Sequence, residues 1–286
     1  MSSPVFFASL RARKVRDNTV SKIARLIQAA GLDAIHEPGD LCAVKLHFGE
    51  AGGDGFIKPP FVRAVVDQVR KQEAKPFLTD TNTLYSGSRH NAVDHMETAI
   101  SHGFAPSVVG APVLIADGLR GENAEEVAIG CKHIQTAIIA GMITRAQSMM
   151  VLSHFKGHEM AGFGGAIKNL AMGCAPSAGK KAQHAVRFTV NEDTCTGCGT
   201  CMAVCPQGAA QVAEEKASID SELCIGCGEC LAQCEDKAVT IDWKADIPPF
   251  MERMTEYALA AVKHKQRKTG YLNFLINITP DCDCVP

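Results

Sequence analysis

The chain has 286 residues, 46% of them hydrophobic and 21% charged, which is enough to bury a core and too apolar for a disordered protein. Its formal net charge of -2 excludes the surplus of lysine and arginine that nucleic-acid binders and polybasic membrane binders need. No apolar run approaches the ~18 residues that span a bilayer and the first residues lack a signal-peptide pattern, so we expect a cytoplasmic protein that binds neither nucleic acid nor membrane.

Helical and strand-like patterns alternate over residues 1–187. The first expected helix starts at Asn18 or Thr19 and ends at Gly31, with its apolar positions on one face; these are Val20, Ile23, Ala24 and Ile27. Further helices are expected after Pro59, over 88–101 and over 166–172. The expected strands are apolar runs without strict alternation, as in strands covered on both faces; they are 42–48, 76–81, 113–116, 136–140 and 149–153. The pattern predicts an α/β fold, with a mostly parallel sheet and flanking helices.

Eight of the 13 cysteines fall between residues 195 and 234, in an acidic part of the chain. Residues 188–243 carry ten acidic and two basic side chains, against 21 acidic and 27 basic ones in the remainder. The cysteines form two runs, CTGCGTCMAVCP from Cys195 and CIGCGECLAQCE from Cys224, offset by 29 residues. This duplicated C-x2-C-x2-C-x3-C spacing is the bacterial ferredoxin pattern for two 4Fe-4S clusters.

Each cluster is expected to take three cysteines from one run and the fourth from the other. The predicted ligands are Cys195, Cys198, Cys201 and Cys234 for the first cluster, and Cys224, Cys227, Cys230 and Cys205 for the second. Zinc is the alternative, but a zinc site leaves no role for the third regularly spaced cysteine of each run. Glu235 stands where the pattern has proline, which alters the expected turn and not the ligation.

We expect this cysteine module to be an insertion. Pro248 and Pro249 open a helix to about residue 265, and 271–278 is one more apolar strand, yet 43 residues could hardly bury these elements alone. The predicted division is an α/β host domain over 1–187, an inserted 2×4Fe-4S ferredoxin module of bacterial ferredoxin-like α+β fold over 188–243, and the resumed host over 244–286.

Residues 153–184 hold three histidines, four lysines and six glycines after an apolar strand, where an open α/β sheet binds ligands. The candidate catalytic residues are His154, Lys156, His158 and Lys168, and the candidate substrate-binding residues are Lys45, His47, Gly164, Gly165, Asn169 and His184. Lys45 and His47 join this site only if their strand neighbours the one ending at Ser153; otherwise His47 is a core histidine. The alternative for the whole segment is a surface loop with glycine turns and solvated lysines. Weaker candidates are Asp80, Asn82, Asp117, Cys282 and Cys284.

Two other ligand types are disfavoured by the spacing in this segment. The glycines fit neither a phosphate loop nor a G-x-G-x-x-G run, so no nucleotide site is predicted. His154 and His158 would share a face and bind a metal if helical, but Gly157 between them disfavours a helix.

Several blocks of the chain resemble a known family. KLHFGE, FLTDTNTLYSGSRHNAVDH, LIADGL, LSHFKGH, GFGGAIKNLAMGC and DCDC together resemble the domain of unknown function 362 family, uncharacterised iron-sulfur centre proteins, over essentially the whole chain. The resemblance implies 4Fe-4S binding and electron transfer, without a settled substrate. Similar proteins continue past the DCDC segment, so we expect this chain to be a fragment without the last strands.

The leading hypothesis is an iron-sulfur redox protein, a ferredoxin-linked oxidoreductase whose clusters relay single electrons. The electrons would pass between a redox partner protein or soluble carrier and a small-molecule substrate in the host. One alternative is a pure electron carrier or docking protein, whose acidic module steers a basic partner. Another is a metal or cofactor maturation protein, which uses the histidines and Cys174, Cys282 and Cys284 as transfer ligands.

Overall fold

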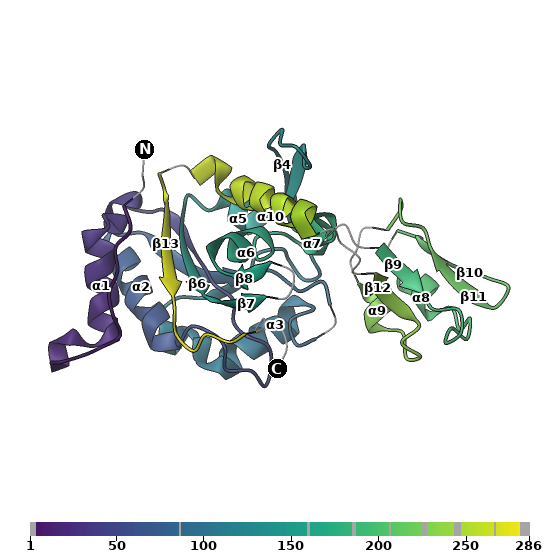
Figure 1. Ribbon diagram of the computed structural model, residues 1–286, viewed down its shortest axis with the longest axis horizontal. Helices are drawn as coiled ribbons and strands as arrows, with labels where there is room; N and C mark the ends of the chain where they lie inside the picture. The colour runs from purple at the N-terminus through teal and green to yellow at the C-terminus, as the bar shows by residue number, and fades with distance from the viewer. Residues whose placement is uncertain are drawn as a thin grey trace.

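A five-stranded parallel sheet forms the centre of the protein, for which a computed structural model describes residues 4–85, 87–158, 161–184, 187–205, 207–224, 228–242, 247–265 and 267–280. The strands are β1 (Leu41–Lys45), β2 (Lys75–Asp80), β3 (Val113–Ile115), β6 (Ser148–His154) and β13 (Thr269–Phe274). Their order is β13-β6-β1-β2-β3, with parallel pairing throughout (Figure 1). The chain therefore winds outward from β1 in both directions, as in doubly wound folds. The predicted α/β fold with a mostly parallel sheet is confirmed.

Helices cover both faces of this sheet. One face packs against α1 (Thr19–Ala29), α2 (Pro59–Lys71), α3 (Ala92–Ala99) and α4 (Pro106–Val109) through a core that includes Val44, Leu78 and Leu152. The opposite face, which includes Ala43, Met149 and Val151, packs against α5 (Gly141–Arg145), α6 (Ala166–Ala171) and α10 (Ile247–Val262). Helix α7 (Ser177–His184) contacts α10. Because strand residues alternate between the faces, Lys45 lies on the same side as Ala43, next to α6.

Smaller elements complete the described chain. They are the helical turns Val15–Asp17, Leu32–Ile35, Ile100–Phe104 and Lys263–Lys265, the hairpin of β4 (Ala124–Ala128) with β5 (Thr136–Ala140), and the hairpin of β7 (Lys156–His158) with β8 (Gly162–Gly164). No helix among the described residues has the length and apolar character needed to cross a bilayer.

Five local expectations differ from the structure. The strand expected over 42–48 ends at Lys45, so His47 lies after β1. Val20 is 43% exposed, because the buried side of α1 is centred on Ile23 and Ile27. Helix α3 begins at Ala92 and not at 88, because the Asn91 side chain caps it by accepting from the backbone N–H groups of Val93 and Asp94.

The other two differences concern strands. The run 136–140 is a strand, but it pairs antiparallel with β4 and does not join the central sheet. The run 271–278 is a strand only as far as Phe274, where its pairing with His154 of β6 ends.

Residues 187–242, here called the cysteine segment, contain an internal structural repeat. Antiparallel pairs join β9 (Arg187–Val190) to β12 (Val239–Asp242) and β10 (Ala210–Ala213) to β11 (Lys216–Ile219). The helices α8 (Thr200–Ala203) and α9 (Glu229–Ala232) each follow a glycine with φ near 80°, Gly199 and Gly228. Strands β9 and β11, helices α8 and α9, and strands β10 and β12 all correspond at an offset of 29 residues. The sequence duplication is therefore also a duplication of structure.

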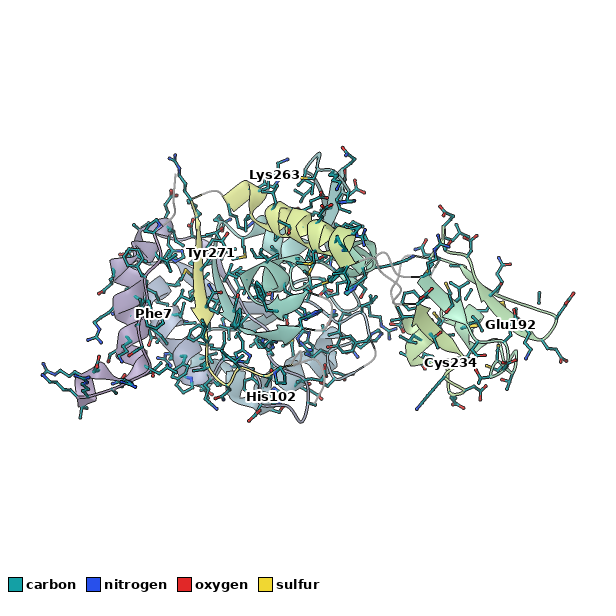
Figure 2. The ribbon with its side chains drawn as sticks, in the orientation of Figure 1. Phe7, His102, Glu192, Cys234, Lys263 and Tyr271 are labelled. Carbon is teal, nitrogen blue, oxygen red and sulfur yellow. The ribbon has the colours of Figure 1, made fainter. Side chains whose placement is uncertain are left out.

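The chain returns to the central sheet after the cysteine segment. Strand β13 adds to the edge of the sheet, parallel to β6, with Tyr271 beside Val151. Helix α10 packs against α6 and α7. Figure 1 shows the cysteine segment to one side of the sheet, near α7, and Figure 2 labels Glu192 and Cys234 on it.

Candidate functional site

Four cysteines of the cysteine segment line one small cavity. Cys195, Cys198 and Cys201 come from the first run, and Cys234 follows α9 in the second. Apolar residues such as Val190 and Val239 form much of the remaining wall. The three cysteines of one run and the last cysteine of the other therefore face a common space.

Backbone N–H groups point at two of these sulfurs. Ala217 N donates to Cys195 Sγ (3.4 Å) and Ala238 N donates to Cys234 Sγ (3.3 Å). The Cys198 thiol lies 3.4 Å from Thr200 Oγ1, and hydrogen bonds from Thr200 lower the pKa of Cys198. Thiols with N–H donors around an apolar cavity are the donor set and surroundings of a protein-bound iron-sulfur cluster, so these residues fit such a group.

The predicted ligands of the second cluster, which include Cys205 from the end of the first run, repeat part of this arrangement. Ala209 N donates to Cys205 Sγ (3.2 Å), as Ala238 N does to Cys234. Burial raises the pKa of Cys205, but hydrogen bonds from backbone N–H groups outweigh it and the pKa is lowered. Cys227 lies outside the described residues. Within the described ranges, no three His, Cys, Asp or Glu side chains are gathered closely enough to hold a metal ion.

The second run also lies against the α/β part of the chain. Glu229 of α9 accepts a hydrogen bond from Arg120 Nη1 (2.6 Å), and its other oxygen is 3.7 Å from His90 Nε2. A Cβ on Gly228 would be 3.0 Å from Leu84 O, so glycine permits this close approach.

In the α/β part, Lys45 and Asn169 meet where β1 and β6 end. Lys45 has no exposed surface; its ammonium donates to Asn169 Oδ1 (2.6 Å) and pairs with Asp80 Oδ1 (3.0 Å). Asn169 Nδ2 donates to Leu152 O (2.9 Å). A Cβ on Gly173 would lie 2.3 Å from Lys45 Nζ, so glycine leaves room for the ammonium. The site lies at the ends of β1 and β6, the neighbouring strands from which the strand order continues in opposite directions. Doubly wound folds bind ligands at this position.

His47, His154 and Lys156 form a second group beside this one. Lys156 Nζ lies 3.3 Å from His47 Nε2, and the rings of His47 and His154 have centroids 6.1 Å apart. Burial, together with the charge of Lys156, holds the pKa of His47 well below its usual value. His154 Nε2 lies 2.6 Å from Ile276 O. Strand β1 does neighbour β6, the condition under which Lys45 and His47 join the segment that follows Ser153.

The remaining predicted residues surround α6 and α7. Gly164 is paired with Lys156 in the β7–β8 hairpin, and Gly165 precedes α6. The ring of His184 stacks on Phe250 with centroids 4.7 Å apart. Burial lowers the pKa of His184 to about 3, and the charges of Lys168 and His158 act in the same direction. His154 and His158 lie on strands and not on one helix, so the helical arrangement for a metal is absent there.

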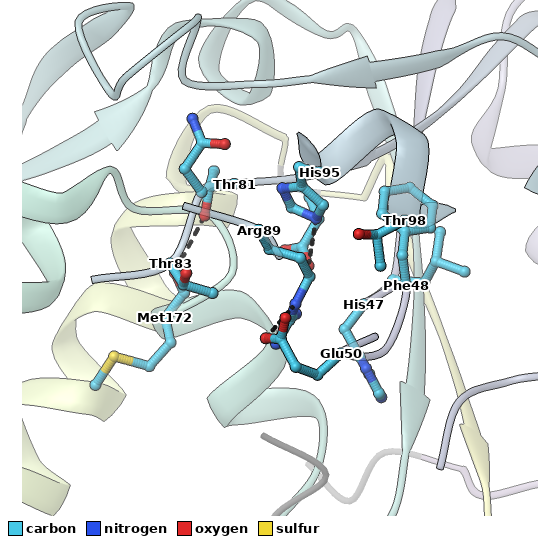
Figure 3. A network of polar contacts seen from close by, with 12 residues as sticks. His47, Phe48, Glu50, Thr81, Thr83, Arg89, His95, Thr98 and Met172 are labelled. Atoms are coloured by element: carbon cyan, nitrogen blue, oxygen red, sulfur yellow. Dashed lines mark hydrogen bonds and ion pairs between the residues drawn. The ribbon is translucent and has the colours of Figure 1, made fainter. Parts of the chain in front are cut away.

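Asp80, one of the weaker candidates, belongs to a buried charge network with residues that the sequence pattern does not single out, Arg89, His95 and Glu50 (Figure 3). Asp80 lies 3.8 Å from Arg89 Nη1 and 3.9 Å from His95 Nε2. Arg89 Nε donates to Glu50 Oε2 (3.1 Å), and Figure 3 shows these two side chains facing each other. Burial raises the pKa of Asp80, but the surrounding positive groups, Lys45 first, outweigh it and the pKa is lowered. Burial also lowers the pKa of His95 to about 3.

Among the weaker candidates, Asn82 and Asp117 lie together. Asn82 N donates to both carboxylate oxygens of Asp117 (3.1 and 3.2 Å), and burial raises the pKa of Asp117 to about 6. Lys180, one of the four lysines of the 153–184 segment, donates to Thr81 Oγ1 (2.6 Å), and burial lowers its pKa to about 8. Cys174 is fully buried, which raises its pKa to about 11. Cys282 and Cys284 lie outside the described residues.

Comparisons with known proteins identify a family. The chain matches the family described as "Domain of unknown function (DUF362)" over residues 42–286, and no curated protein matches it. Among solved structures, the lactate racemase apoprotein from Thermoanaerobacterium thermosaccharolyticum is 13% identical with a TM-score of 0.49; the match covers 86% of this chain and 44% of that one. A structural genomics protein from Thermotoga maritima is 9% identical with a TM-score of 0.43, covering 87% of this chain and 59% of that one. This chain thus spans less than two thirds of either protein.

Proposed function

The chain belongs to the DUF362 family of domains of unknown function, and we propose that its residues 188–243 form a bacterial ferredoxin-like module that binds two 4Fe-4S clusters. The observation that carries this proposal is the cavity lined by Cys195, Cys198, Cys201 and Cys234. Four cysteine thiolates are the full ligand set of one such cluster, and here they come from both runs. When bound, the clusters supply transfer of single electrons.

The internal repeat supports a second cluster of the same kind. Strands and helices recur at the 29-residue offset, and so do the N–H bonds of Ala209 to Cys205 and of Ala238 to Cys234. By this correspondence, Cys224, Cys227, Cys230 and Cys205 hold the second cluster. Zinc ribbons bind their metal through paired C-x2-C units, so a zinc site would not explain why both runs carry four regularly spaced cysteines.

Iron and acid-labile sulfide analysis of anaerobically purified protein tests the clusters. We expect about eight iron and eight sulfide per chain, as two 4Fe-4S clusters require. Cys234→Ser should lose up to about half of both, whereas Cys131→Ser, a cysteine outside both runs, should keep them. Zinc without sulfide, or equal contents in both variants, would refute the proposal.

We further propose that the clusters exchange electrons with a small molecule bound in the α/β domain. The second run contacts Leu84 and His90, and the neighbouring Arg89 belongs to the buried network of Asp80 and Lys45. The small molecule would bind beside this network, at His154, Lys156 and the other polar groups where β1 and β6 end. An external redox partner protein or soluble carrier would exchange electrons with the clusters.

Stopped-flow reoxidation of dithionite-reduced protein tests this second step. A panel of carbonyl compounds and disulfides serves as the oxidants, and wild type is compared with His154→Ala and Lys168→Ala. We expect at least one oxidant to react with wild type and to lose its effect in both variants, while iron and sulfide stay unchanged. Equal rates in all three proteins would instead favour a pure electron carrier, whose Cys198 is exposed to a partner.

A further inference from the structure

A lysine stabilises the first cysteine run from within the cysteine segment. Lys216, the first residue of β11, donates from Nζ to the carbonyl oxygens of Glu192 (2.6 Å) and Cys195 (2.7 Å). Cys195 is the first cysteine of its run. The lysine thus fixes the start of this loop and places a positive charge next to it.

The internal repeat predicts Arg187 in the same role for the second run. Arg187 begins β9 as Lys216 begins β11, and Cys224 corresponds to Cys195 at the same offset. Arg187, however, is exposed, and the Cys224 carbonyl accepts its hydrogen bond from Lys181 Nζ. Lys181 belongs to α7, which packs against α10 in the α/β part of the chain.

Other contacts with the α/β part also fall on the second run. Arg120 binds Glu229, and Gly228 approaches Leu84. In the first run, Cys198 is exposed and Thr196 donates to Asp236 (2.7 Å) within the cysteine segment. The two runs therefore have different surroundings despite their common backbone structure.

We propose that Lys181 is a positioning residue for the second 4Fe-4S cluster, and that this cluster faces the α/β domain while the first faces the external redox partner. The inference rests on the proposed function. Lys181, which belongs to α7 in the α/β part of the chain, takes the role that the repeat predicts for Arg187 of the cysteine segment. The second cluster site is therefore complete only when the α/β part and the cysteine segment are folded together. A reduced cluster carries one more negative charge than an oxidised one, so the Lys181 ammonium raises the reduction potential of the second cluster.

Lys181→Met and Lys216→Met form a matched pair for the test. Each removes one ammonium from the carbonyl of a first cysteine and keeps most of the side-chain length. One charge roughly 10 Å away at an effective dielectric constant of about 20 changes the oxidised-to-reduced ratio about tenfold, or about 59 mV for one electron. Redox titration of the full-length protein, followed by electron paramagnetic resonance, measures the two midpoint potentials.

We expect Lys181→Met to lower one midpoint potential and Lys216→Met to lower the other, with iron and sulfide contents as in wild type. Hydrogen exchange should also increase around residue 224 in Lys181→Met alone, which identifies the affected loop. If Lys181→Met contains both clusters and leaves both potentials and this exchange unchanged, the role of Lys181 is refuted while cluster binding stands. Wild-type protein without iron and sulfide would overturn the proposed function itself.

Discussion

The buried ion pair of Lys45 and Asp80 allows a quantitative prediction. Their side chains are 0% and 5% exposed and their charged atoms are 3.0 Å apart. Asp80→Asn keeps the side-chain shape but leaves the Lys45 ammonium buried without its anion, and it removes the anion near Arg89. Breaking a buried pair in this way costs about 3–5 kcal/mol of unfolding free energy. For a chain of this size that corresponds to a fall in Tm of about 6–20 °C.

Equilibrium urea unfolding, followed by far-ultraviolet circular dichroism, measures this cost. The matched control is Asp67→Asn, which breaks the Arg63–Asp67 pair on α2, where both side chains are nearly half exposed (45% and 46%). Exposed pairs at this helical spacing contribute about 0.3–0.5 kcal/mol. Lys45→Met combined with Asp80→Asn should cost less than the sum of the single changes by about 0.5–3 kcal/mol, because the two residues are in contact.

Two results would refute this reasoning. If Asp80→Asn were no more destabilising than Asp67→Asn, the buried charges would not depend on one another. If the double variant cost the full sum of the single changes, the Lys45–Asp80 contact would contribute nothing beyond the separate burial of each residue.

Three further predictions concern other parts of the fold. Burial holds the pKa of Asp117 at about 6, above the ordinary 3.8. Between these two values the folded protein keeps a proton that the unfolded chain releases. The free energy of unfolding that this carboxyl contributes is therefore fully present below pH 3.8 and is lost as the pH rises through 6. In urea unfolding, the free energy of unfolding of Asp117→Asn should fall by up to about 3 kcal/mol less than that of wild type between pH 4 and pH 7. The same pH dependence in both proteins would contradict this role of Asp117. In Gly157→Ala the new Cβ would lie 1.6 Å from Pro280 O, so the segment 275–280 must move; hydrogen exchange there should rise, and wild-type protection would argue against this packing. The pKa of the buried Cys174 is about 11, so iodoacetamide at neutral pH should label the half-buried Cys131 before Cys174, and equal labelling of these two residues by mass spectrometry would show that Cys174 is accessible.

Much of the fold could be predicted because local patterns and tertiary packing agree. The valines of α2 lie on one face after Pro59, and the structure buries that face; Pro248 and Pro249 similarly lie in the first turn of α10. The apolar run over 136–140 correctly predicts the strand β5 but not the strand that pairs with it, because hydrophobic periodicity does not indicate which strands are neighbours. Its pairing with β4 depends on tertiary structure alone.

The candidate site was harder to predict because it depends on strand order. Lys45 and Asp80 each end a strand, and they meet only because β1 and β2 are parallel neighbours. The sequence pattern places Arg89 in the helix expected over 88–101, which gives no reason to expect its contact with Asp80. The role of Lys181 depends on a residue 43 positions further along the chain, Cys224, and no local pattern connects them.

The two ends of the cysteine segment meet in one pair of residues. Arg187 and Asp242 are partners in the β9–β12 ladder, so the chain leaves the segment about 5 Å from where it entered. For the central sheet, the 56 residues from Arg187 to Asp242 act as a single surface loop, and the entropy cost of closing a loop grows only slowly with its length. A protein of this fold can therefore gain, lose or exchange such a segment during evolution without rearranging its sheet, and a short flexible linker in its place should leave the strand order unchanged.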